Sequence, residues 1–62
     1  MSYFDQRGLE PEYIEKIIFR KNPYSIVIIF KSGNGIDAKA PNYEVWQNLM
    51  DEAIESGIRI EL

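Results

Sequence analysis

The sequence predicts a small α+β domain, in which an antiparallel sheet in β-β-β-α-β order packs one face against a single amphipathic helix. Three features lead to this prediction: a glycine-rich turn between two apolar runs, a stripe of apolar residues at helical spacing, and a short alternating run after that stripe. All 62 residues fit one domain. A chain of this length buries only about 60% of the surface that its unfolded form exposes, so we expect a small core.

Residues 1–11 are the least regular part of the chain. Gly8 and Pro11 interrupt them, and few apolar side chains, such as Tyr3 and Phe4, are available as anchors. We therefore expect a flexible or loosely docked N-terminal arm, with one helical turn beginning near Pro11.

Residues 13–20 fit two periodicities. They alternate as a strand would, and Ile14, Ile17 and Ile18 also recur at helical spacing. Their content of Ile, Tyr and Phe favours a strand. The Asn22-Pro23 turn signal that follows would let this strand pair with the next apolar run as a hairpin. A strand is therefore the preferred interpretation.

Residues 24–31 form the clearest predicted strand. One face carries Tyr24, Ile26, Ile28 and Phe30. The middle of the other face carries Val27 and Ile29, so both faces are apolar, as in a central strand that is covered on each side. One helix covers only one face of a sheet. Val27 and Ile29 then need a second cover, which the N-terminal arm or a second chain would supply.

The segment Ser32-Gly33-Asn34-Gly35 is the strongest turn signal. Asn34-Gly35 is typical of a type I′ hairpin turn, which needs two positive φ angles. Residues 36–40 then alternate as a strand, with Ile36 on the inward side. Because a strand and not a helix follows the glycines, the segment is not a phosphate-binding loop.

The helix is predicted over residues 43–56. Asn42 is a favourable N-cap, and Gly57 suits the position after the last turn. The inner stripe contains Trp46, Leu49, Met50 and Ala53. Residues 58–62 alternate again and predict a last, short strand.

The inventory of reactive side chains argues against an enzyme. The chain has no Cys and no His, which excludes thiolate metal sites and the usual nucleophile–histidine arrangements. The acidic residues Asp51, Glu52 and Glu55 lack the spacing of a calcium loop and are interpreted as the solvated face of the helix. We expect no catalytic residue, cofactor or bound metal.

The charges are distributed unevenly around a net charge of −3. Residues 15–40 carry five basic and two acidic side chains, whereas residues 41–62 carry one basic and five acidic ones. One interpretation is a nucleic-acid surface on the first hairpin, made by Lys16, Arg20, Lys21 and Lys31 with aromatic residues between them. The overall acidity argues against that interpretation.

The preferred hypothesis is a small binding, regulatory or inhibitor module that acts through protein–protein contacts, with itself as one partner in a homodimer. Val27, Ile29 and Tyr43 are the expected contact residues. The size, the acidity and the lack of catalytic side chains are also typical of accessory proteins that mobile genetic elements encode. No apolar run is long enough to span a bilayer, and we expect a cytoplasmic protein without membrane contact.

Overall fold

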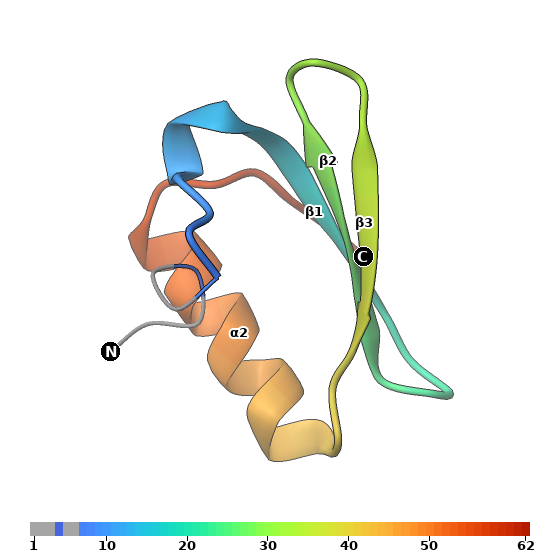
Figure 1. Cartoon of the computed structure of the whole chain (residues 1–62). Coiled ribbons are helices and arrows are strands. Elements are labelled where there is room, and N and C mark those ends of the chain that lie inside the picture. The colour runs from blue at the N-terminus through green and yellow to red at the C-terminus, as the bar shows by residue number, and fades with distance from the viewer. Residues whose placement is uncertain (1–3, 5–6) are drawn as a thin grey trace.

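A computed structural model describes Phe4 and residues 7–62 of the chain. The elements in order are the 3-10 helix η1 (Pro11–Tyr13), the strands β1 (Ile14–Arg20), β2 (Ser25–Phe30) and β3 (Gly35–Lys39), the helix α2 (Tyr43–Glu55) and the strand β4 (Ile60–Glu61). The predicted fold class and element order are confirmed, and every predicted boundary of a strand or of the helix falls within two residues of the observed one. The structure forms two layers, with α2 lying along one face of the sheet (Figure 1).

The four strands form one sheet in the order β3-β2-β1-β4. The pairs β1–β2 and β2–β3 are antiparallel, but β4 is parallel to β1, so the sheet is mixed rather than antiparallel throughout as predicted. The crossover explains the difference. Because α2 returns the chain across the sheet, β4 runs in the same direction as β3, and β3 already runs in the direction of β1.

The ambiguous segment is a strand, as preferred. β1 pairs along its length with β2, from Ile14 opposite Phe30 to Arg20 opposite Ser25, with a bulge between Ile14 and Lys16. The turn between the two strands contains a cis peptide bond before Pro23. Pairing on both edges, with β2 and β4, holds this segment in an extended form that its helical periodicity alone would not require.

The second hairpin is where the expected turn, type I′ at Asn34-Gly35, is wrong. Gly33 has a φ of 100°, whereas neither Asn34 nor Gly35 has a positive φ, and Gly35 is the first residue of β3. The Gly33 N–H donates to the Phe30 carbonyl at 2.9 Å, and the Phe30 N–H donates to the Asn34 carbonyl at 2.8 Å. These bonds close a three-residue loop in which the glycine of the left-handed position is Gly33.

Helix α2 begins and ends close to the predicted residues. The Asn42 side chain accepts a hydrogen bond from the Val45 N–H at 2.9 Å, which is the predicted N-cap. Gly57 has a φ of 75°, the left-handed conformation that ends many helices. The last helical residue is Glu55, one residue before the predicted end.

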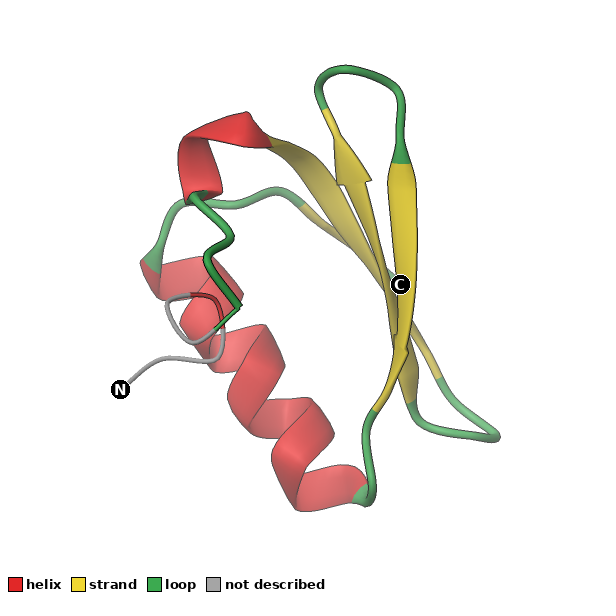
Figure 2. Ribbon diagram, in the orientation of Figure 1, coloured by secondary structure: helices red, strands yellow, loops and turns green. Residues whose placement is uncertain are grey.

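Figure 2 shows α2 along one face of the sheet, and the core lies between these two layers. In the described part of the chain it is built from ten buried hydrophobic residues: Phe4, Ile14, Ile17, Phe19, Ile26, Ile28, Trp46, Leu49, Ala53 and Ile58. Phe4, in the arm expected to be flexible or loosely docked, is only 1% exposed, and the Leu9 N–H donates to its carbonyl at 2.8 Å. The predicted turn near Pro11 is η1. The rest of that prediction concerns residues 1–3 and 5–6, which lie outside the described part of the chain.

None of the helices among the described residues is long and apolar enough to cross a membrane.

Candidate functional site

The face of the sheet opposite α2 is not covered by any described element, as Figure 1 shows. Strand alternation places Ile18, Val27 and Ile29 on this face, because Ile17, Ile26 and Ile28 are buried on the other. Ile18 and Val27 are direct cross-strand partners, and Ile29 follows two positions along β2. We call these three partly exposed side chains the open-face row.

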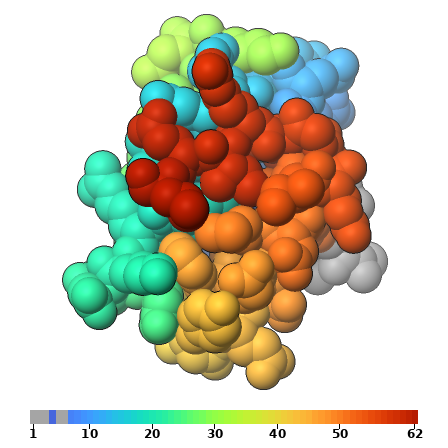
Figure 3. Space-filling model, turned by 180° about the vertical axis from the view of Figure 1, so that it is seen from behind, coloured from blue at the N-terminus to red at the C-terminus, as the bar shows by residue number. Residues whose placement is uncertain are grey.

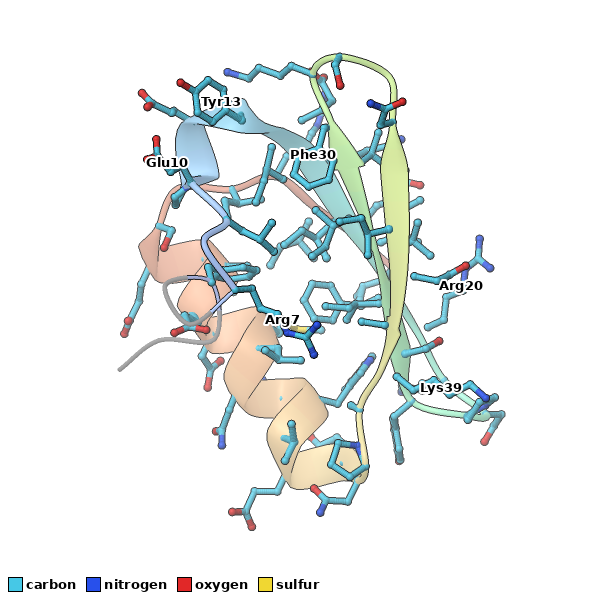
Figure 4. All side chains as sticks on the ribbon, in the orientation of Figure 1. Arg7, Glu10, Tyr13, Arg20, Phe30 and Lys39 are labelled. Carbon is cyan, nitrogen blue, oxygen red and sulfur yellow. The ribbon has the colours of Figure 1, made fainter. Side chains whose placement is uncertain are left out.

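Charged residues surround the open-face row. Lys16 Nζ and Glu61 Oε1 form an ion pair of 3.1 Å that joins β1 to β4 across the face. Arg20 and Lys39 project from the side of the sheet that faces away from α2, as Figure 4 shows. Asp37 lies opposite Val27 in the register of β2 and β3. The face therefore combines an apolar centre with a charged margin of both signs, which is the usual composition of a protein interface.

Gly35 extends the apolar centre toward β3. It lies opposite Ile29, and a Cβ atom at this position would come 3.3 Å from Ile29 Cδ1. The Ile29 side chain therefore lies against the bare backbone of Gly35. Because glycine has no side chain, no β3 side chain stands beside Ile29 at this position.

Tyr43 does not belong to this face, although the sequence suggested it as a contact residue together with Val27 and Ile29. It is the first residue of α2 and is 53% exposed. Its ring centroid lies 5.7 Å from that of Tyr24 and 6.0 Å from that of Trp46, on the helix side of the sheet. The three expected contact residues therefore lie on two separate surfaces.

The second surface is a groove of about 640 Å³ between the end of the first hairpin and α2. Its walls include Phe19, Tyr43, Trp46 and Met50, with Leu62 at one side. Figure 3 shows the segments that line it, with the C-terminal segment in red beside the first hairpin in teal and α2 in orange. Its lining is mostly aromatic and aliphatic, and Tyr43 contributes to it.

The four basic residues of the nucleic-acid alternative do not form one stripe. Lys16 and Arg20 share the open face, with Lys16 paired to Glu61. Lys21 Nζ lies 5.8 Å from the centroid of the Trp46 ring, on the helix side. Lys31 lies beyond the opposite end of β2 from Arg20. Phe19 is buried in the core, and the open face presents the aliphatic Ile18 between Lys16 and Arg20, so no stacking aromatic lies between these two cations on that face.

One carboxyl group has a perturbed proton affinity. The pKa of Glu10 is raised above its ordinary value, first by a hydrogen bond with the Glu12 side chain and then by repulsion from the Glu12 charge. Both residues are exposed near η1, away from the open-face row. In the part of the chain that the structure describes, no group of three or more acidic residues is arranged to hold a metal ion.

Sequence reasoning did not single out every residue of the open face. Ile18, Asp37 and Lys39 belong to it, but the protein-contact residues predicted from the sequence included only Val27 and Ile29 from this face, and Lys16 and Arg20 were assigned to the nucleic-acid alternative. Ile18 follows directly from the register, because it is the cross-strand partner of Val27. The alternation of residues 13–20 as a strand already places Ile18 on the face opposite Ile17 and Phe19.

No protein-family model, no curated protein sequence and no solved structure matches this chain. The fold and the site define a class of architecture: a small α+β domain with one face of a four-stranded sheet under a helix and the other face open. Function is therefore inferred from the open face itself.

Proposed function

We propose that the protein is a small non-enzymatic binding module of the cytoplasm, which docks on protein partners through the open face of its sheet and associates with itself. The observation that carries the proposal is the open-face row. Three β-branched side chains lie side by side on the two central strands, and no described element covers them.

The shape and chemistry of the face support a protein partner. The open-face row forms an aliphatic centre, and burying an aliphatic side chain completely contributes about 1.5–3 kcal/mol relative to leaving it exposed. Arg20, Asp37 and Lys39 lie at the margin, and among the described residues they form no ion pair. A partner with an apolar centre and polar groups at its edge would satisfy both features, since charged groups at an interface margin mainly determine specificity.

The test places a photoreactive amino acid on the open face in cells of the native source. The probe replaces Val27 in one variant. In the matched control it replaces Asn48, which is exposed on α2. After irradiation, we expect the probe at position 27 to give a discrete protein adduct heavier than the 7.3 kDa chain, and the probe at position 48 to give none. Combining the probe at position 27 with Arg20→Glu should reduce the adduct, because Arg20 lies at the margin of the same face.

Two outcomes would contradict the proposal. Equal labelling from positions 27 and 48 would show that the open face is not a preferred contact surface. An adduct at position 27 that disappears after nuclease treatment would show that the open face binds nucleic acid instead of a protein. Mass spectrometry of the adduct distinguishes a second copy of the chain from another protein.

A further inference from the structure

Strand β3 has one edge that no strand in the described part of the chain pairs with, because it is the first strand in the order β3-β2-β1-β4. The hydrogen bonds at its two ends show which residues turn toward β2. The Asn34 carbonyl accepts from Phe30 and the Ala40 N–H donates to Tyr24, so even-numbered residues face β2. Backbone groups alternate along a strand. The N–H and C=O groups of Gly35, Asp37 and Lys39 therefore point to the free edge.

The side chains along this edge carry a self-complementary pattern. Asp37 and Lys39 lie on the open face, opposite Val27 and Ser25 of β2, and make no ion pair within the described chain. On the helix side, Ile36 is 44% exposed although it is paired with the buried Ile28. On this short edge strand, Asp37 and Lys39 therefore lack a charged partner among the described residues, and Ile36 is only partly covered.

We propose that a second copy of this chain adds to the free edge, with the two β3 strands antiparallel and a two-fold axis passing beside Ala38. This inference rests on the self-association in the proposed function and specifies its surface and register.

The register follows from backbone geometry and charge. Because odd-numbered residues carry the free hydrogen-bonding groups, they must pair with odd-numbered residues of the second copy. With the axis at Asp37, two carboxylates would lie opposite each other, and with the axis at Lys39, two ammonium groups would. With the axis at Ala38, Asp37 lies opposite Lys39 of the second copy, and the symmetry repeats this pair. Opposite charges at directly paired positions are stabilising, and like charges there are destabilising.

The same register suits Ala38 and Ile36. Ala38 then faces its own copy in a non-hydrogen-bonded pair, where Cα atoms approach to about 4.5 Å and a small side chain is favourable. Ile36 lies beside Ala40 of the second copy on the helix side, and this contact buries part of the Ile36 side chain.

The two-fold axis is perpendicular to the sheet, so both helices lie on one side. The two open-face rows then lie on one continuous surface on the other side, which doubles the surface offered to a partner.

The test reverses the charges one at a time and together. Sedimentation equilibrium measures self-association for the unmodified chain, for Asp37→Lys, for Lys39→Asp and for the double variant. The protein concentration runs from about 10 µM to about 1 mM, the range in which dimers with small interfaces dissociate. We expect a concentration-dependent dimer for the unmodified chain. Each single reversal should raise the dissociation constant about tenfold or more, because it creates two like-charged pairs. The double variant, and an equimolar mixture of the two single variants, should restore the dimer, because both recover opposite charges at every pair.

A second measurement does not depend on charge or on how the reversed variants fold. The chain has no cysteine, so Ala38→Cys introduces a single thiol at the proposed axis. Oxidised glutathione should convert it to a disulfide dimer, since paired Cα atoms about 4.5 Å apart lie within disulfide range. Ile36→Cys is the control and should form no disulfide dimer, because residue 36 does not face its own copy in this register.

A 7.3 kDa particle at every concentration, or single reversals that associate as strongly as the unmodified chain, would overturn the inference. Efficient cross-linking of Ile36→Cys but not of Ala38→Cys would overturn the register. The proposed docking function is tested separately, because Val27 lies away from the free edge. If the chain dimerises but the probe at position 27 gives no adduct, docking on the open face is refuted and the dimer stands. If the probe gives an adduct but the chain stays monomeric, the dimer is refuted and docking on the open face stands.

Discussion

The Trp46 indole Nε1 donates a hydrogen bond to the backbone carbonyl of Ser25 at 3.1 Å, which joins the first half of α2 to the start of β2. Trp46 is 3% exposed, and its ring lies edge-on to Phe19 at a centroid distance of 5.7 Å. A buried indole needs both an apolar environment and an acceptor for its N–H. The contact between Trp46 and Ser25 therefore fixes the position of α2 on the covered face of the sheet, and so determines which face stays open.

The first prediction concerns this contact. Trp46→Phe retains an aromatic ring but removes the indole N–H and part of its volume, so we expect the free energy of unfolding to fall by about 1–3 kcal/mol. Chemical denaturation followed by circular dichroism measures the change. Tyr43→Phe is the matched control, because it removes only the exposed hydroxyl that donates to Gln47, and it should change stability by less than about 0.5 kcal/mol.

The second prediction concerns the start of α2. The Asn42 side chain accepts from the Val45 N–H, so Asn42→Ala leaves that donor without its cap. We expect a loss of about 1 kcal/mol in the free energy of unfolding. Asn48→Ala, within the same helix and exposed, should be neutral or slightly stabilising because alanine favours helix. Equal effects at the two positions would contradict the capping role.

The third prediction separates the two hairpin turns that the glycine-rich segment could form. The observed turn needs a positive φ at Gly33 only, so Gly33→Ala should destabilise the protein by about 1 kcal/mol or more. At Gly35 the tightest contact of a new Cβ would be with the end of the Ile29 side chain, which can move, and the Ile28 carbonyl oxygen at 3.5 Å is an ordinary van der Waals contact, so Gly35→Ala should cost less. A larger loss at Gly35 than at Gly33 would favour the type I′ turn instead. Thermal unfolding of the two variants gives the order.

The fourth prediction compares neighbouring residues on the two faces of β2. Ile28 is 1% exposed in the core, and Ile28→Ala should lower the free energy of unfolding by about 2–5 kcal/mol. Ile29→Ala removes the same atoms from the open face. Since Ile29 is only partly buried, we expect a clearly smaller loss when the variant is measured below its association range. Similar losses would mean that the second face is also packed in the isolated chain.

Much of this fold could be predicted from the sequence because its signals are local. The Asn42 cap, the stripe of α2 and the alternation of β2 each depend on neighbouring residues, and all appear where expected. The turn could not be predicted in the same way. Gly33 and Gly35 both permit a positive φ, and the pairing register, which places Gly35 opposite Ile29, decides between them.

The candidate site was predictable in part for the same reason. Alternation alone places Val27 and Ile29 on the face opposite the core, and the structure confirms that placement. The surface on which Tyr43 lies depends on how the first turn of α2 packs against Tyr24. This is a tertiary contact without a local signal in the sequence. The burial of Phe4 is likewise a long-range contact that its irregular surroundings did not indicate.

The most direct test of the central claim, that the open face is where a protein partner docks, is methyl NMR of the chain in extract from the native source. Chains labelled at isoleucine and valine methyl groups report from both sides of the molecule. The account predicts that the signals of Ile18, Val27 and Ile29 shift or broaden, whereas Ile54, which is 59% exposed on α2, keeps its signal. The signal of Ile36 reports separately on the free edge of β3. Perturbation of Ile54 with an unchanged open-face row would contradict the claim.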